Sequence, residues 1–430
     1  MFRDLCYIIE GDIMAKIAPA KTLEEAYRYL NPLRPLQGEW LETFYVERPP
    51  DSRIDHLLEG LRMDISGDDK TLFSGQQGAG ETTELNRLSQ ELQDSHILIF
   101  FSAEEMLNLG DIHYTDLLVL LGLQVYRKAR AQGFAADDQK VRDLLVWYEE
   151  YLGRDEIRRL QSEVNAEINL GVVRFGTRLA QDAPFRARVR NYSEANLSDL
   201  LTHLNDLLTE LHQRSNQHIL VIVDGLDKIY DLRRAAELFL HGANALIAPA
   251  CRIIYTVPFP LFYSHDFQQV RQQFHRNFLL PNVKVQERNG APYELGREML
   301  RQVLLRRVQE ELITREALEA LVEASGGLLR ELLHLARLSV LFARNRKDTR
   351  ITLEDVESAR REVRNTFRRI LKAEDYENLW KVYEGKSLAN IPPEAADRLL
   401  HNLSILEYDG EIWWDVHPAV RDLLESAEDK

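Results

Sequence analysis

The fold of this chain is set by ten residues, Ser74-Gly75-Gln76-Gln77-Gly78-Ala79-Gly80-Glu81-Thr82-Thr83. Their pattern is that of a phosphate-binding loop, G-x-x-x-x-G-K-[ST], with Glu81 at the lysine position. Glycines let backbone N–H groups turn inward around phosphate oxygens, and the helix that follows directs its positive N-terminal end at the same anion. We expect the Thr82 hydroxyl to reach Mg²⁺. A carboxylate at position 81 repels the phosphates that a lysine would contact.

The residues on either side of the loop fit the same interpretation. Thr71-Leu72-Phe73 is a short strand-like run before it, and leucines recur at helical spacing after it, at Leu85, Leu88 and Leu92. A phosphate cradle requires strand, glycine loop and helix in that order. A chance glycine-rich turn is therefore the less favoured interpretation.

A second motif lies at His218-Ile219-Leu220-Val221-Ile222-Val223-Asp224-Gly225-Leu226-Asp227. An aliphatic run that ends in an acid places the carboxylate at the carboxyl end of a central parallel strand, where ligands bind in open α/β sheets. We expect Asp224 to hold Mg²⁺ through water and Asp227 to orient or activate the attacking water. The alternative is a buried strand that ends in a turn-forming Asp-Gly pair, which the loop at 74–83 makes less favoured.

Three further strands are predicted around these motifs. Residues 95–101 and 251–257 are apolar runs, and the second places Thr256 at the same sheet edge as Asp224. Residues 278–285 form a fifth strand, in which Pro281 indicates an edge position. The segment 104–212 is predicted to be helical.

Several arginines leave two interpretations open. Arg48 lies in a run of aromatic residues and valine before the loop. This run either covers an adenine base or is an ordinary edge segment that packs against the core. Alternate arginines at 186, 188 and 190 are typical of a solvated edge, and a phosphate or partner contact is the alternative. Arginines at 360, 364 and 368 share one helix face, which is solvated or paired with acids in most proteins and meets phosphate in fewer.

The C-terminal third has two patterns. Residues 293–372 are predicted to be helical and include Gly326-Gly327-Leu328-Leu329-Arg330 at the start of one helix. Helices at about 374–383 and 394–402 then precede a β-hairpin over 403–416, with Asp409-Gly410 at its turn. Helices followed by such a hairpin predict a winged helix.

Composition narrows the class of protein. The chain has 430 residues, 45% of them hydrophobic and 29% charged, which is typical of a globular protein with two or three domains. A net charge of −15 argues against a general nucleic-acid coat. Two distant cysteines, Cys6 and Cys251, favour a reducing cytoplasm. No membrane span is expected, the N-terminus is too acidic for a signal peptide, and Met14 is a second plausible start.

With these motifs, residues 44–425 resemble AAA+-related P-loop ATPases, especially the STAND group and origin-recognition-like members with a C-terminal winged helix. The resemblance implies an α/β fold with a parallel-sheet P-loop NTPase core of the ASCE/AAA+ type, a helical lid and a winged-helix domain. It also implies ATP or ADP with Mg²⁺ as cofactors. It predicts that the cofactor is bound by Arg48 and by the Walker A residues Gly75, Gln76, Gln77, Gly78, Ala79, Gly80, Glu81, Thr82 and Thr83. It predicts Thr82 and Asp224 as the metal ligands. It predicts Asp227, Thr256 (as sensor 1) and Arg330 (as sensor 2) as the catalytic residues.

The resemblance divides the chain into an N-terminal extension (1–43), a core (44–290) with a helical insertion at about 104–212, a lid (291–372) and a winged helix (373–430). Arg271 and Arg276 are arginine-finger candidates by position. This sequence departs from the family's pattern at Glu81 and at Lys228, where many relatives carry a second acid.

The expected function is a nucleotide-regulated switch that acts through self-association or activation of a protein partner, in bacterial defence or signalling. Glu81 is expected to weaken ATP binding and hydrolysis. One alternative is a DNA-binding origin-recognition-like protein. It is disfavoured because the predicted recognition helix carries Glu394 and Asp397 with Arg398 as its fixed cation. The other alternative is a scaffold around a pocket that does not respond to nucleotide.

Overall fold

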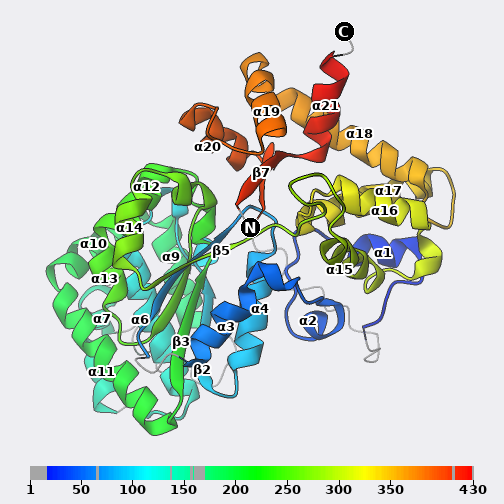
Figure 1. The fold of residues 1–430 in the computed structure, drawn as a ribbon. Helices are drawn as coiled ribbons and strands as arrows, with labels where there is room; N and C mark the ends of the chain where they lie inside the picture. The colour runs from blue at the N-terminus through cyan, green and yellow to red at the C-terminus, as the bar shows by residue number, and fades with distance from the viewer. Residues whose placement is uncertain are drawn as a thin grey trace. The chain divides into compact units, whose positions relative to one another are not determined.

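The chain, seen here in a computed structural model, is described over residues 17–63, 67–135, 138–154, 158, 170–408 and 412–428. It divides into two compact units. The sheet unit comprises Pro50–Pro281 and Leu388–Gly410, and the helical unit comprises Met1–Pro49, Asn282–Ser387 and Glu411–Lys430. Figure 1 shows the helices and strands of both. Over the described ranges, no helix has both the length and the apolar character needed to cross a membrane.

The sheet unit is built on five parallel strands in the order β2-β3-β4-β1-β5. Their bounds are β1 Lys70–Gly75, β2 His96–Ser102, β3 His218–Asp224, β4 Arg252–Thr256 and β5 Arg276–Leu280. The strand before the glycine loop and the strand that ends in Asp224 are therefore separated by β4 alone. This confirms the predicted α/β class with a parallel-sheet P-loop core. The lid and the winged helix stay predictions.

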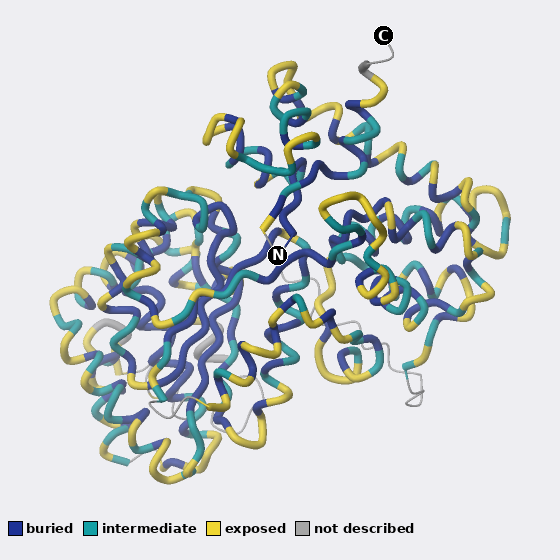
Figure 2. Tube along the Cα trace, viewed as in Figure 1, coloured by how far each residue is buried: buried dark blue, intermediate teal, exposed yellow. Residues whose placement is uncertain are grey.

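Both faces of the sheet are covered, which explains why the strands are continuous apolar runs. Along β3, Ile219, Val221 and Val223 face one hydrophobic cluster, and Leu220 and Ile222 face another. The second cluster is closed by α3 (Ile54–Met63) and α4 (Glu81–Leu92). Figure 2 shows the strands as the most deeply buried part of the unit.

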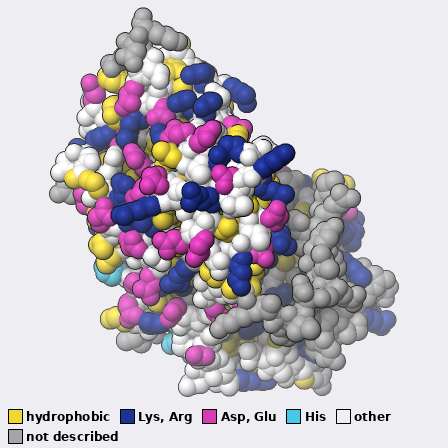
Figure 3. Space-filling model, turned by 90° about the vertical axis from the view of Figure 1, so that its right-hand side faces the viewer, with side chains coloured by type: hydrophobic (Ala, Val, Ile, Leu, Met, Phe, Trp, Pro, Cys, Tyr) yellow, Lys and Arg dark blue, Asp and Glu magenta, His cyan; other side chains and the backbone are white. Residues whose placement is uncertain are grey.

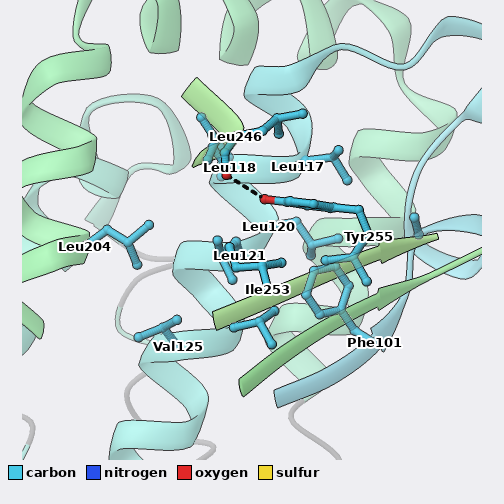
Figure 4. Packing of buried hydrophobic residues seen from close by; sticks show 14 of the residues in the cluster. Phe101, Leu117, Leu118, Leu120, Leu121, Val125, Leu204, Leu246, Ile253 and Tyr255 are labelled. Carbon is cyan, nitrogen blue, oxygen red and sulfur yellow. Dashed lines mark hydrogen bonds between the residues drawn. The ribbon is translucent and has the colours of Figure 1, made fainter. Parts of the chain in front are cut away.

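The first, larger cluster is closed mainly by helices of the predicted insertion. Their bounds are α5 Ala103–Met106, η2 Leu109–Asp111, α6 Tyr114–Ala131, α7 Gln139–Leu152, α9 Leu170–Gln181, α10 Ala183–Ala195 and α11 Leu197–Ser215. In Figure 4 the ring of Tyr255, on β4, lies among leucines of α6. Its hydroxyl donates to the Leu246 carbonyl at 2.9 Å, so this buried polar group is satisfied.

Of the three arginines of α10, Arg188 is exposed as a solvated edge requires, whereas Arg186 and Arg190 are paired with acids. Arg186 is buried, and its Nε donates to Asp111 at 3.0 Å. Arg190 Nη2 donates to the buried carboxylate of Asp116 at 2.6 Å, and Arg190 Nη1 donates to Asp111 at 3.2 Å. The solvated-edge prediction is wrong for Arg186 and Arg190, because two acids from a distant segment pair with them. These ion pairs tie α10 to the start of α6.

Shorter elements complete the sheet unit. They are η1 Pro50–Ser52, η3 Leu226–Lys228, α12 Leu232–Ala236, η4 Glu237–His241, α13 Ala243–Ile247, η5 Phe259–Tyr263, α14 Phe267–Gln273, α20 Pro393–His401 and β6 Ile405–Tyr408. The last two come from the predicted winged-helix segment and belong to this unit. The predicted hairpin turn, Asp409-Gly410, lies outside the described residues.

The helical unit contains one strand, β7, among its described residues. Its elements are α1 Leu23–Tyr29, α2 Glu39–Phe44, α15 Glu294–Leu305, η6 Glu310–Leu312, α16 Arg315–Ala324, α17 Leu329–Asn345, α18 Leu353–Ile370, α19 Ala373–Gly385, β7 Trp413–Val416 and α21 Pro418–Glu428. Arg360 and Arg364, on α18, approach Asp422 of α21 at 3.2 and 3.6 Å. For these two arginines, pairing with an acid is the interpretation that holds.

The fifth strand ends earlier than predicted. β5 stops at Leu280, whereas the sequence predicted a strand to residue 285. Pro281 follows at once, and it has no N–H to donate to a neighbouring strand. The predicted edge position is confirmed, since β5 is the last strand in the sheet order.

Candidate functional site

The glycine-rich loop joins β1 to α4, as the motif predicts. β1 ends at Gly75 and α4 begins at Glu81. Gly78 and Gly80 have φ values of 97° and 104°, a left-handed backbone that residues with a Cβ rarely adopt. Gly80 is the N-cap of α4, so the loop ends directly on the positive end of a helix. That geometry suits a phosphate group.

The loop motif and the strand motif meet through Thr82 and Asp224. The Thr82 hydroxyl donates to Asp224 Oδ2 at 2.9 Å, and the Gly225 N–H donates to Asp224 Oδ1 at 2.8 Å. Asp224 lies at the end of β3 and is buried. Burial raises the pKa of Asp224, although the hydrogen bond from Thr82 works in the opposite direction. A hydroxyl beside a carboxylate is an oxygen donor set that fits Mg²⁺.

Asp227 and Thr256 stand at the same edge of the sheet. Thr256, the last residue of β4, accepts the Leu226 N–H at 2.9 Å and so fixes the turn that carries Asp227. Burial, with the nearby charge of Asp224, raises the pKa of Asp227 to about 6. Asp227 is thus a carboxylate at neutral pH that keeps appreciable basicity, which suits a group that orients water.

Glu81 does not fit a phosphate site. It is the first residue of α4 and is 8% exposed. Its Cγ lies close to Gly75, where an added Cβ would sit 3.2 Å away. A carboxylate at a helix N-terminus is favoured by the helix dipole, but it opposes an incoming polyanion. The glycine backbone and the Thr82–Asp224 pair suit a nucleotide with Mg²⁺, whereas the Glu81 side chain does not.

A pocket opens beside the loop and includes residues that the sequence did not single out. It is lined by Gly75, Gln76, Gln77, Glu81, Asp227, Lys228, Ile229, Tyr230, Phe259, Pro260, Leu400 and His401. Leu400 and His401 come from α20, more than 300 positions after the loop, and no local pattern links them to it. The Tyr230 and His401 rings meet edge to face, 6.0 Å apart.

Gln76 joins the loop to the α20–β6 segment. Its Nε2 donates to the Ile405 carbonyl at 2.9 Å, and its Oε1 accepts the Glu407 N–H at 2.8 Å. Gln76 is 2% exposed. One side-chain amide thus pairs with β6 as a neighbouring strand would.

Lys228 follows Asp227 and pairs with Glu104, the second residue of α5. Glu104 reaches this position because β2 and β3 run in register, with Ser102 opposite Asp224. Burial disfavours the charged form of Lys228, but the contact with Glu104 and the charges of Asp227 and Asp224 together raise the pKa of Lys228. The ammonium also lowers the pKa of Asp224 and of Asp227.

Two predicted site residues belong to the helical unit. Arg330 is the second residue of α17 and is partly exposed, and Arg48 is 7% exposed. Their contacts with nucleotide stay predictions. Of the two arginine-finger candidates, Arg276 pairs with Asp69 at 2.8 Å, and Arg271 is exposed on α14.

Comparison with known proteins gives limited similarity. No family model matches the chain, and no curated protein matches it. Similar solved structures include Drosophila ORC bound to DNA (12% identity, TM-score 0.42, covering 98% of this chain and 96% of that chain). They also include the Aeropyrum pernix ORC2 protein in ADPNP-ADP complexes (12%, 0.43, 94% and 98%) and the Thermotoga maritima RuvB Holliday junction branch migration motor (14%, 0.38, 92% and 98%). Because these identities and TM-scores are low, we draw no argument from the similarity. The assignment of the fold rests on the sheet order and on the position of the glycine-rich loop.

Proposed function

We propose that the sheet unit binds ATP or ADP with Mg²⁺ at residues 75–83. The observation that carries the proposal is the 2.9 Å hydrogen bond from Thr82 to Asp224, which joins residues 142 positions apart. In P-loop NTPases a hydroxyl and an acid in these two motifs hold the metal ion. A glycine-rich turn that formed by chance would have no reason to meet the acidic end of a second strand.

The residues of the site have distinct roles in this proposal. Backbone N–H groups of the loop and of the first turn of α4 hold the phosphates. Thr82 and Asp224 hold Mg²⁺, which when bound neutralises charge on the phosphate oxygens. Asp227 orients the attacking water, and Thr256 keeps Asp227 in place through the Leu226 N–H.

Glu81 lowers the affinity of this site for nucleotide. Replacing the usual lysine with a carboxylate changes the local charge by two units, a penalty of several kcal/mol at an effective dielectric constant of about 20. We therefore expect ATP turnover by this chain to equal that of a blank without enzyme. Turnover that is measurable and abolished by Asp227→Asn would show that the site tolerates Glu81.

The output proposed for the site is a switch. Nucleotide closes the helical lid, which consists of residues 291–372, through Arg330. This closure favours self-association or activation of a protein partner. The setting, bacterial defence or signalling, and the division into core, lid and winged helix are supported by the resemblance of residues 44–425 alone.

Calorimetry with Mg-ATP and Mg-ADP tests the proposal on the chain as it stands and on Glu81→Lys. We expect Glu81→Lys to bind and to gain melting temperature with nucleotide, because a ligand of the folded state stabilises that state by mass action. Glu91→Lys is the matched control. It makes the same charge change about 15 Å further along α4, on a side chain that is 47% exposed, and it should bind no better than the unchanged chain.

A scaffold with an unresponsive pocket would behave differently. In that case Glu81→Lys would lose the helix-dipole stabilisation of about 0.3–1 kcal/mol and melt slightly lower, with no binding at millimolar nucleotide. That result would refute nucleotide binding at residues 75–83.

A further inference from the structure

We propose that Lys228 is the phosphate-contacting cation of this pocket and that Glu104 pairs with it until nucleotide binds. The inference rests on the proposed function, since it names the residue that replaces the missing lysine of the loop. It concerns the geometry of the pocket wall and does not depend on the lid or on self-association.

The first argument is the charge of the pocket. Glu81 and Asp227 contribute two acidic side chains to its wall, and Asp224 ends β3 three positions before Asp227. Among the described residues that line the pocket, Lys228 alone is a lysine or arginine. An anion that enters the pocket therefore meets one permanently charged cationic side chain, that of Lys228. A lysine ammonium can supply this contact as a point charge on a flexible stem.

The second argument is that the side chain can move. The side chains of Lys228 and Glu104 are 40% and 48% exposed, so water solvates both partners of the pair. Exposed pairs of this kind are weak because solvent screens them. A phosphate group can therefore displace the Glu104 carboxylate as the partner of Lys228 without leaving a buried charge behind.

The third argument is the position of Lys228. It directly follows Asp227 in η3, and both residues line the same pocket as the glycine-rich loop. Glu104 is held beside Lys228 by packing: Gly225 has φ 85°, and an added Cβ there would lie 3.1 Å from the Glu104 Cβ. Lys228 thus stands between an acid that restrains it and the place where Mg-nucleotide is proposed to bind.

The experiment measures the affinity of Mg-ADP by calorimetry for the unchanged chain, Glu104→Gln, and Glu104→Gln combined with Lys228→Met. Releasing Lys228 should tighten binding about five-fold or more, and removing the ammonium should erase that gain. A second readout is the chemical acetylation of Lys228, measured by mass spectrometry. Glu104→Gln should raise the labelling, and millimolar Mg-ADP should suppress it.

The controls are Asp206→Asn and Asp206→Asn with Lys140→Met. Lys140 and Asp206 form a pair of the same kind between α7 and α11, with side chains 37% and 44% exposed. Neither change should alter the affinity for Mg-ADP.

Three results would overturn the inference: an affinity that Glu104→Gln leaves unchanged, a gain that survives Lys228→Met, or labelling of Lys228 that nucleotide does not suppress. If Glu81→Lys binds nucleotide while these results are obtained, the proposed function stands and the role of Lys228 is wrong. If Glu81→Lys also fails to bind, the proposed function itself is wrong.

Discussion

Gln76 Oε1, in the glycine-rich loop, accepts the backbone N–H of Glu407 at 2.8 Å, across 331 positions of sequence. The Nε2 of the same amide donates to Ile405, two residues earlier on β6, at 2.9 Å. A strand residue would offer the same donor and acceptor pair to β6. The loop and the β6 segment are therefore hydrogen-bonded to each other inside the sheet unit. Either the two segments move together or these hydrogen bonds break.

Gln76→Ala should loosen β6. It leaves a buried N–H and a buried carbonyl without this partner, at a cost of about 1–3 kcal/mol. Hydrogen exchange should therefore accelerate at the Glu407 amide by roughly ten-fold or more, while the strands β1 to β4 change little. Gln93→Ala, at the exposed C-cap of α4, is the control. Unchanged exchange at Glu407 would show that the two hydrogen bonds do not hold β6.

Asp227→Asn should stabilise the sheet unit above pH 6. The pKa of Asp227 is about 6 when folded and 3.8 ordinarily, so ionising it costs folding free energy as pH rises through this window. Above pH 6, the free energy of unfolding of the asparagine variant should exceed that of the unchanged chain by at most about 3 kcal/mol. This difference should vanish below about pH 4. Urea unfolding in EDTA at pH 4 and pH 7.5 measures both limits.

The control for this prediction is Asp199→Asn, on an exposed position in the first turn of α11. Its effect should stay within about 0.5 kcal/mol at both pH values. A difference for Asp227→Asn that is equal at pH 4 and pH 7.5 would contradict the raised pKa.

The helical unit should lose stability in acid through His417. His417 is 1% exposed, its Nδ1 accepts the Ala419 N–H at 3.1 Å, and burial lowers its pKa from 6.5 to about 3. The unfolded chain binds the proton first, so stability is full above pH 6.5 and is lost as pH falls toward 3. Between pH 7 and pH 5 the loss from this group should be about 2 kcal/mol.

His417→Asn should remove that loss, because asparagine keeps an acceptor at the N-terminus of α21 but does not titrate in this range. Urea unfolding at pH 7 and pH 5, followed by tryptophan fluorescence, measures the difference. His203→Asn, on α11, is the control and should leave the acid loss intact. An equal acid loss in His417→Asn and in the unchanged chain would exclude His417 as its source.

Duplex DNA should bind weakly. The predicted recognition helix, α20, carries Glu394 and Asp397, and its end residues Leu400 and His401 line the pocket beside the loop. The face drawn in Figure 3 mixes Lys and Arg with Asp and Glu and shows no single-sign patch among its described residues. We expect fluorescence anisotropy of the full chain to show no salt-sensitive binding tighter than roughly 10⁻⁶ M. Tighter, salt-sensitive binding would favour the DNA-binding alternative.

Local chemistry in the sequence was enough to predict the core. A glycine loop between an apolar run and a leucine-spaced helix has few ways to fold, and the strand bounds came within a residue or two of those observed for β2 and β3. The sequence also indicated that Thr82 and Asp224 would meet, because parallel strands bring their carboxyl ends to one edge. It failed at β5, where the apolar pattern continues past Pro281 but the ladder does not.

Contacts between distant segments were decided by the tertiary structure alone. Gln76 and Glu407, Lys228 and Glu104, and Arg190 and Asp111 are each brought together by packing that no spacing of residues encodes. The pKa of Asp227 likewise depends on how completely the turn after β3 is shielded from water. Periodicity and turn chemistry act over a few residues, whereas burial and charge pairing depend on where the chain returns in space.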